Sequence, residues 1–289
     1  MMDLSIDFGA STIDVIYWEG LIERKFLCIK SFERAEFFGD HDLKKFFERA
    51  EINLKKIEKI FVTGGRSRLY PDKIGGVLLV KISEIEAIGR GGYYMWKTDE
   101  AFGKRQKSIT QNFLVVSMGT GTCMVQVEVD EKGYVKSQHV GGTGVGGGTF
   151  MGLSKLLLAE KDPQKLQKLF KNGNKDKVDL SVKDIIGSGI GLVPADATAS
   201  NLGKLAREVD FSDADLASGI ENLIGQTIGI LAVFAAKASG SSCILLTGKL
   251  TRMKSIVRII QKIGGIYQVP IFLPTDAAYV GSFGAGFFG

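Results

Sequence analysis

Short apolar runs that end in small or polar residues fill the first third of the chain. Residues 4–9 (LSIDFG) are one run, residues 11–20 alternate apolar and polar positions up to a turn, and residues 21–32 are a third. Two more follow at residues 56–65, which end in Gly-Gly, and at residues 75–82. Such runs are typical of strands, so we expect a sheet that begins with a hairpin-rich meander.

Helical spacing interrupts these strands twice. Residues 41–52 place four apolar side chains on one helical face: Leu43, Phe46, Phe47 and Ala50. Residues 83–97 predict a second helix, for which Ser83 is a suitable N-cap.

The pattern then repeats. Residues 112–130 predict a strand, a Gly/Thr turn and a second strand, residues 132–140 a third strand, and the glycine-rich residues 139–153 lead into a helix that ends near 160. Five elements are expected after it: a long helix at 215–239, a strand at 243–250, a helix at 251–264, an edge strand at 268–274 and a terminal helix at 277–289. A strand–turn–strand–strand–helix order that occurs twice indicates an α/β fold with duplicated mixed-sheet topology.

Composition narrows the possible functions. Glycine accounts for 37 of 289 residues, about 13% and roughly twice the usual share, and it clusters at a few places. The net charge is +5, with a modest basic concentration at residues 165–177 that we interpret as a solvated helix face. Aromatic residues are not regularly interleaved with these lysines, since Phe170 is the single one in the segment, so we expect no nucleic-acid partner. A small net positive charge does suit a protein that binds phosphorylated ligands.

Cysteines and apolar runs indicate a cytoplasmic protein. Cys28, Cys123 and Cys243 lie far apart in apolar stretches, so we expect free thiols in a reducing compartment. The first residues, MMDLSIDFG, lack the features of a signal peptide, and the apolar run 228–236 is too short to cross a bilayer. We therefore expect no membrane partner.

Two similar turns are the strongest chemical feature. Residues 7–12 (DFGAST) and 117–122 (SMGTGT) each join two strands through small residues, whose backbone N–H groups can approach an oxyanion closely. Two such turns that face each other across a cleft would hold a polyphosphate from both sides. Asp7, at the end of the first strand, is placed to hold a hydrated Mg²⁺. Either turn alone would be interpreted as an ordinary hairpin, but the pair together with the glycine-rich loop favours a nucleotide site.

Neither common phosphate motif is present. No Gly-Lys-Ser/Thr follows a glycine-rich stretch, so there is no Walker A loop. Residues 142–148 (GTGVGGG) approach the Rossmann spacing, but they follow meander strands and no acidic residue stands about 20 positions after the last glycine, Gly148.

The same stretches resemble the type II pantothenate kinases. The matching motifs occur in order along nearly the whole chain: residues 6–20, 62–67, 83–91, 116–127, 140–153, 178–187, 194–204 and 279–288. The resemblance implies an actin-like ATPase (ribonuclease H-like) fold of two lobes, with ATP and Mg²⁺ in the cleft. It further implies transfer of a phosphoryl group to the pantothenate hydroxyl, the first step of coenzyme A synthesis, by a homodimer held through helix 215–239. We place the lobes at 1–110 and 111–289, with the terminal helix as a candidate to pack back on the first.

The resemblance assigns roles to individual residues. Glu84 is the catalytic glutamate, a base near the acceptor hydroxyl; Glu86 lies two positions on, roughly 200° around a helix, so only one of them can face the cleft. Without the resemblance, Glu84 would be interpreted as a solvated acid favoured by the helix dipole. Asp7 is the magnesium-associated aspartate. The nucleotide-binding positions are Gly9, Ser11 and Thr12 in the first turn, Gly119, Thr120, Gly121 and Thr122 in the second, Gly144, Gly146, Gly147 and Gly148 in the glycine-rich loop, and Gly248 beside the adenosine.

Three departures from the family pattern leave the acceptor open. The family has Gly-Gly-Thr with a lysine three residues beyond the threonine, where this chain has Gly9-Ala10-Ser11 and Asp14. The acceptor side is placed at His139, Gly141 and Gly142, and His139 stands where the family has an arginine that binds the pantothenate carboxylate. An imidazole cannot make the bidentate, permanently charged contact of a guanidinium, a loss of about 1.5–3 kcal/mol in acceptor binding.

The third departure is the glycine- and aromatic-rich segment 89–97, whose rings either belong to the core or reshape the acceptor pocket. Two alternatives to a pantothenate kinase thus remain. One is a kinase of another small hydroxyl metabolite, favoured by His139. The other is a nucleotide- or acyl-CoA-binding pseudokinase, favoured by Ala10 and Asp14 but opposed by the presence of both Asp7 and Glu84.

Overall fold

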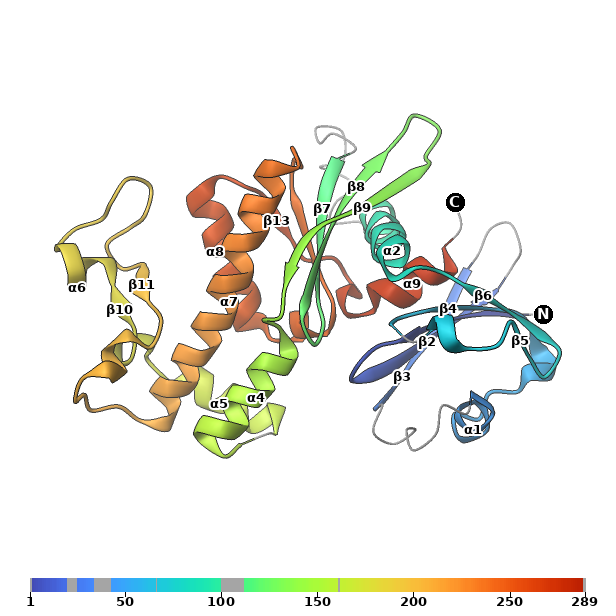
Figure 1. Ribbon diagram of the computed structural model, residues 1–289, viewed down its shortest axis with the longest axis horizontal. Helices are drawn as coiled ribbons and strands as arrows, with labels where there is room; N and C mark the ends of the chain where they lie inside the picture. The colour runs from blue at the N-terminus through green and yellow to red at the C-terminus, as the bar shows by residue number, and fades with distance from the viewer. Residues whose placement is uncertain are drawn as a thin grey trace.

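Two mixed sheets with a pair of helices between them form the molecule (Figure 1). The computed structural model describes residues 2–19, 25–33, 43–65, 67–99, 112–160 and 162–287. The predicted boundary between lobes, at 110/111, lies outside these residues.

The first sheet has the strand order β3-β2-β1-β4-β6-β5. Its strands are β1 (Met2–Phe8), β2 (Thr12–Glu19), β3 (Lys25–Glu33), β4 (Ile57–Thr63), β5 (Lys73–Ile74) and β6 (Val77–Lys81). β1, β2 and β3 form the expected antiparallel meander, whereas β4 and β6 run parallel to β1 and to each other. One face is apolar and packs against α1 (Leu43–Arg49), since Leu4, Ile6 and Phe8 share a core with the phenylalanines of that helix.

The second sheet has the order β13-β12-β7-β8-β9. Its strands are β7 (Asn112–Met118), β8 (Thr122–Val129), β9 (Val135–Thr143), β12 (Ile244–Thr247) and β13 (Ile271–Phe272). One face is covered by α7 (Asp213–Ala238) and α8 (Lys254–Tyr267), with α4 (Gly147–Leu158) and α5 (Pro163–Asn172) beside them. As in the first sheet, an antiparallel meander is followed by two parallel strands, so the predicted duplication of mixed-sheet topology is confirmed.

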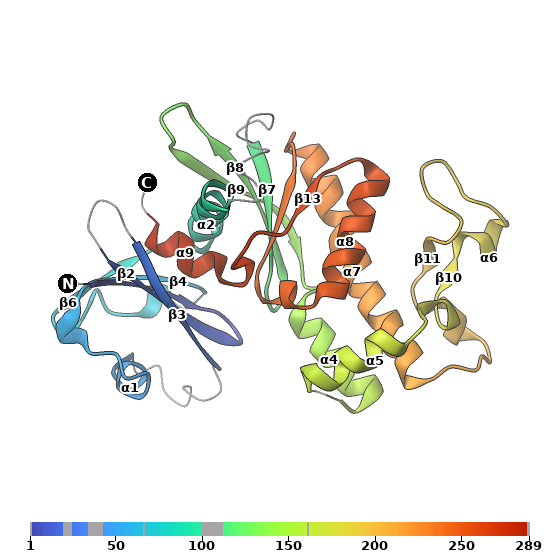
Figure 2. The same cartoon turned by 180° about the vertical axis from the view of Figure 1, so that it is seen from behind.

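The last helix of each half packs on the sheet of the other half. α2 (Glu84–Thr98) follows the first sheet in sequence but packs against β7, β8 and β9 of the second. α9 (Val280–Gly286) follows the second sheet but packs against β1 and β4 of the first. Both views show the two helices side by side between the sheets (Figures 1 and 2). The close packing of α9 on β1 requires a glycine, because a methyl group at Gly281 of α9 would collide with the carboxylate of Asp7 on β1.

The aromatic side chains of segment 89–97 belong to this central layer. Tyr94 stacks on Phe283 of α9 at 5.0 Å between ring centroids, and Trp96 stacks on Phe113 of β7 at 5.6 Å. Of the two interpretations of these rings, the structure thus supports the core.

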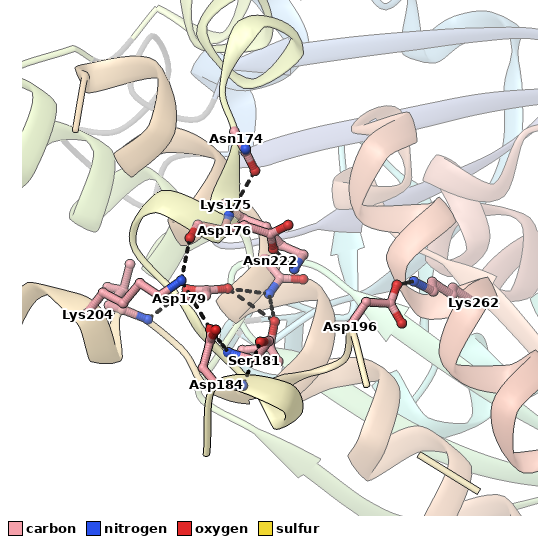
Figure 3. A network of polar contacts seen from close by, with 12 residues as sticks. Asn174, Lys175, Asp176, Asp179, Ser181, Asp184, Asp196, Lys204, Asn222 and Lys262 are labelled. Atoms are coloured by element: carbon pink, nitrogen blue, oxygen red, sulfur yellow. Dashed lines mark hydrogen bonds and ion pairs between the residues drawn. The ribbon is translucent and has the colours of Figure 1, made fainter. Parts of the chain in front are cut away.

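A small two-stranded unit extends beyond α7, at the far end from the first sheet (Figure 1). It contains β10 (Leu180–Ser181), α6 (Val182–Ile186) and β11 (Thr198–Ser200). Figure 3 shows how it is tied to α7: the side chain of Asn222, on α7, donates to Asp179 Oδ2 at 2.7 Å. Within the unit, Asp179 Oδ1 accepts from the Leu202 N–H at 2.7 Å. The sequence did not reveal this unit, because its strands are only two and three residues long.

Short 3₁₀ segments complete the described chain: Leu54–Lys56, Ser67–Leu69, Lys175–Lys177, Gly203–Ala206, Lys249–Arg252 and Ala277–Tyr279. By length and composition, α7 could cross a membrane, the one helix in the described part of the chain that could. However, 61% of its most apolar window is buried inside the fold, as expected of a core helix.

Candidate active site

A row of polar side chains crosses the inner face of the first sheet. Asp7 of β1 lies directly opposite Asp14 of β2, which in turn lies opposite Ser31 of β3, and Thr63 of β4 is in register with Asp7. Residues paired in this way point to the same face of a sheet. Asp14 and Thr63 are buried. The row faces α9, on the side of the sheet opposite α1.

Asp7 lies in an unusual electrostatic environment. Burial, Asp14 and Glu84 raise the pKa of the Asp7 carboxyl to about 7, although Lys249 opposes the shift. A carboxylate in these surroundings is stabilised when a cation joins it. Within the described ranges no group of three or more His, Cys, Asp or Glu side chains could hold a metal alone. Asp7 therefore suits a Mg²⁺ that takes its other ligands from water and phosphate oxygens, the usual arrangement in nucleotide sites.

The two predicted phosphate turns meet. Gly9 and Ser11 lie in the connection of β1 to β2, which leads into Thr12, the first residue of β2. Gly119 to Gly121 form the connection of β7 to β8, which leads into Thr122, the first residue of β8. Ser11 Oγ and Thr120 Oγ1 are 3.2 Å apart, so side chains from the two halves touch at this point. The structure thus brings both turns into one place, with Asp7 at the base of the first.

The glycine-rich loop packs directly on the second turn. The N–H groups of Gly147 and Gly148 donate to the carbonyls of Gly119 and Thr120 at 2.8 and 2.9 Å. A Cβ at Gly146 would stand 2.6 Å from the Thr120 carbonyl oxygen, closer than side chains pack, so only glycine fits there. Thr122 Oγ1, on β8, donates to the Val145 carbonyl of the loop, and Thr149 Oγ1 donates to the Gly144 carbonyl. The first N–H groups of α4 thus shape the turn rather than remain free for a ligand.

Gly248 lies beside the same turn. It follows β12, its N–H donates to the Ala277 carbonyl at 2.7 Å, and its φ of +88° favours glycine. A Cβ there would be 2.5 Å from the carbonyl oxygen of Met118, the last residue of β7. The next residue, Lys249, reaches the first sheet, where its Nζ is 2.6 Å from Asp14 Oδ1.

Lys249 is the functional candidate that the sequence analysis missed. Asp14 and Lys249 are separated by 235 positions, and no local pattern shows that the end of β12 meets β2. One signal was available, since an aspartate where the resemblance predicts a lysine calls for a compensating cation.

Glu84 and Glu86 have different surroundings at the start of α2. Glu86 is tied to the helix surface: its N–H donates to the N-cap Ser83 Oγ, its carboxylate accepts from Ser83, and Arg90 lies 3.6 Å away. Glu84 is exposed, and its charge contributes to the raised pKa of Asp7 in the first half and of Cys123 in the second. Of the two glutamates, Glu84 is therefore the one next to the polar row.

The acceptor-side residues lie on β9, facing α2. Ser137 contacts α2 at Gly89, and His139, two residues further along the strand, shares its face. His139 is exposed. Gly142 pairs with Cys123, whose pKa is raised to about 11 by burial and by Glu84, and Gly141 pairs with Met124. The carboxyl-terminal end of β9 and Glu84 therefore both lie near Cys123 of β8.

Solved structures with a similar fold define the class. Over 99% of this chain, component A of (R)-2-hydroxyglutaryl-CoA dehydratase from Acidaminococcus fermentans aligns with a TM-score of 0.63 at 16% identity, covering 96% of that chain. The activator of 2-hydroxyisocaproyl-CoA dehydratase from Clostridium difficile, with bound ADPNP, gives 0.59 at 16% identity and 92% of its length. A ROK family glucokinase from Streptomyces griseus, in complex with glucose and AMPPNP, gives 0.57 at 10% identity and 98% of its length. The duplicated sheets and paired turns therefore form an actin-like ATPase fold.

Sequence relatives give the family. The family model described as Fumble matches residues 4–285. A type II pantothenate kinase of Bacillus cereus strain G9842 is 31% identical over 287 residues, which cover 98% of this chain and 96% of the relative. Another, from Bacillus cereus strain ATCC 14579, is 30% identical over the same shares of both chains. The chain belongs to the Fumble family of type II pantothenate kinases.

Proposed function

We propose that this protein is a kinase that transfers the γ-phosphoryl group of ATP to the hydroxyl of pantothenate, the first step of coenzyme A synthesis. Family membership supports the reaction. The observation that carries the assignment of the site is the contact of Ser11 with Thr120, because it brings two small-residue turns together beside Asp7 and Glu84. The bound nucleotide would lie between the halves, with residues 1–110 and 111–289 as the two lobes.

Each part of the site has a role in this reaction. The turns at 9–12 and 119–122 bind the phosphates, the loop at 144–148 holds the second turn in shape, and Gly248 borders the adenosine. Asp7 would hold Mg²⁺, which neutralises phosphate charge when bound. Phosphoryl transfer depends mainly on such positioning and charge neutralisation. Glu84 accepts the proton that the acceptor hydroxyl loses.

A second candidate has the same chemistry with a different acceptor. His139 lies on the face of β9 that turns to α2, at the position where the family pattern has its carboxylate-binding arginine. That placement favours a hydroxyl metabolite without a carboxylate. The pseudokinase alternative loses one of its two arguments, because the charge of Asp14 is compensated by Lys249.

We also propose a cytoplasmic homodimer. The helix expected to form the interface is α7, whose inner face is buried in the core while Leu231 and Phe234 remain 41% and 52% exposed. Large apolar side chains on the outer face of a core helix suit a contact with a second copy.

Purified protein with Mg-ATP and a panel of hydroxyl acceptors tests the function through ADP release, with ADP binding measured separately by calorimetry. We expect turnover with pantothenate. Turnover of another acceptor instead would select the second candidate, and intact ADP binding without any turnover would contradict both kinase assignments. His139→Arg is expected to lower the KM for pantothenate several-fold, since it restores a bidentate carboxylate contact.

A further inference from the structure

A lysine from the second half is held in the polar row of the first sheet. Lys249 Nζ lies 2.6 Å from Asp14 Oδ1 and 3.3 Å from Ser31 Oγ. The Lys249 side chain is 24% exposed and that of Asp14 is 6% exposed. The ion pair therefore joins β2 to the end of β12, and the ammonium keeps partial access to solvent.

The surroundings fix the ammonium in place. It lies 4.0 Å from the ring centroid of Tyr279, whose hydroxyl accepts a hydrogen bond from Arg252 at 2.8 Å. Burial lowers the pKa of Lys249, and Asp14 opposes that shift. An ammonium has three N–H donors, of which Asp14 and Ser31 account for two among the described contacts. One donor remains for a further acceptor.

The position of the pair relative to the phosphate turn is defined by the strand register. Asp14 lies directly opposite Asp7 and three residues after Ser11 of the first turn. The resemblance predicts a lysine at position 14, where this chain has a carboxylate that would repel a phosphate. Lys249, which follows β12 of the second sheet, supplies a positive charge beside position 14, and this charge opposes the rise in the pKa of Asp7.

We propose that Lys249 contacts the phosphates of the bound nucleotide and that Asp14 is the positioning residue that holds it there. The inference rests on the proposed function in so far as a nucleotide binds between the two turns. The alternative is that the pair only ties the two halves together. If Lys249 contacts a phosphate, its removal weakens the binding of ADP but not that of adenosine. If the ion pair only joins the two halves, its removal lowers the stability of the protein and affects the binding of both ligands equally.

Calorimetry with Mg-ADP and with adenosine separates these roles. Lys249→Met is expected to weaken ADP binding about 10- to 100-fold, the range for a hydrogen bond between charged groups, and to change adenosine binding less than about twofold. The matched control is Lys262→Met, which removes an equally charged lysine from an exposed ion pair with Asp196 and should alter neither affinity. An ADP affinity of Lys249→Met within twofold of the wild type would overturn the proposal, as would equal weakening of both ligands.

Two double variants guard against misfolding and test the position. Asp14→Met with Lys249→Met removes both charges and leaves no buried carboxylate unpaired, so it should fold and still bind ADP weakly. Asp14→Lys with Lys249→Met moves the ammonium to β2 and should restore ADP affinity to within several-fold of the wild type. A folded protein without that recovery would contradict the assigned position.

Failure of this inference is distinguishable from failure of the proposed function. The readout is nucleotide binding, so a wrong acceptor leaves these results unchanged. A wild-type protein that does not bind ADP would overturn both proposals.

Discussion

Two carboxylates next to the paired turns have opposite surroundings. Asp7 is enclosed by strands and by α9, and burial with two acidic neighbours raises its pKa to about 7. Glu84 is exposed at the first turn of α2, where the helix dipole favours negative charge. Asp7 thus suits a cation, whereas Glu84, which is exposed to solvent, is the proposed proton acceptor.

Glu84→Gln should lower kcat at least about 100-fold, because the variant keeps the shape of the side chain but cannot accept the acceptor's proton. ADP affinity should stay within about twofold, which calorimetry can check. The matched control is Glu86→Gln, two residues away and tied to Ser83 and Arg90, which should keep kcat within a few-fold. Equal losses in both variants would contradict a specific role for Glu84.

The raised pKa of Asp7 predicts a pH effect on the ligand-free protein. Between the ordinary pKa of 3.8 and about 7, the folded state binds more protons at Asp7 than the unfolded state does. The free energy of unfolding should therefore fall as pH rises through this window, by up to about 4 kcal/mol, and level off above it.

Urea unfolding of the wild type and of Asp7→Asn at several pH values, in EDTA and without nucleotide, measures this effect. The variant cannot ionise at this position and should lose less stability between pH 4 and 7 than the wild type. The same pH dependence in both proteins would show that Asp7 is not the group responsible.

At the scale of elements, the glycine-rich loop supports the second turn. Backbone hydrogen bonds from Gly147 and Gly148 fix the turn, and Gly146 lies against the Thr120 carbonyl. The conformation of the second turn therefore depends on both the β7–β8 connection and the start of α4.

Gly146→Ala should weaken ADP binding at least about 10-fold, because its methyl group would stand 2.6 Å from a backbone oxygen that cannot move without the turn. Gly152→Ala is the control on the same helix. Its Cβ would meet no atom within 4 Å, so ADP affinity should not change and stability should rise by up to about 1 kcal/mol. Calorimetry and thermal unfolding of both variants provide the comparison, and a normal ADP affinity for Gly146→Ala would argue against support by the loop.

Elements whose signals are local could be predicted from the sequence. Strands bounded by Gly/Thr turns, the Ser83 cap and the long α7 all have short-range patterns, and the duplicated topology follows from their order. Contacts between distant segments could not be predicted in this way. The Lys249–Asp14 pair and the small unit around β10 depend on which strand ends meet, which no periodicity encodes.

At the scale of the whole molecule, the outer face of α7 supports the proposed homodimer. Phe234→Glu should shift the protein from dimer to monomer in sedimentation at micromolar concentration, because a charge would have to be buried at the interface. Leu69→Glu, at a residue 77% exposed beside the first sheet, is the matched control and should remain dimeric. A wild-type monomer, or a dimer that survives Phe234→Glu, would contradict this use of α7.

The exchange of α2 and α9 between the halves has a consequence for how the chain folds during synthesis. When the first sheet leaves the ribosome, the helix that will cover its polar face is still to be translated, because α9 ends at Gly286. We expect the amino-terminal half to stay protease-sensitive until α9 has been translated. Pulse proteolysis of a chain truncated after Thr275 would test this, and a resistant first sheet would contradict it. Translation of α9 would thus act as a checkpoint, so that a polypeptide interrupted before Val280 leaves the polar face of its first sheet uncovered.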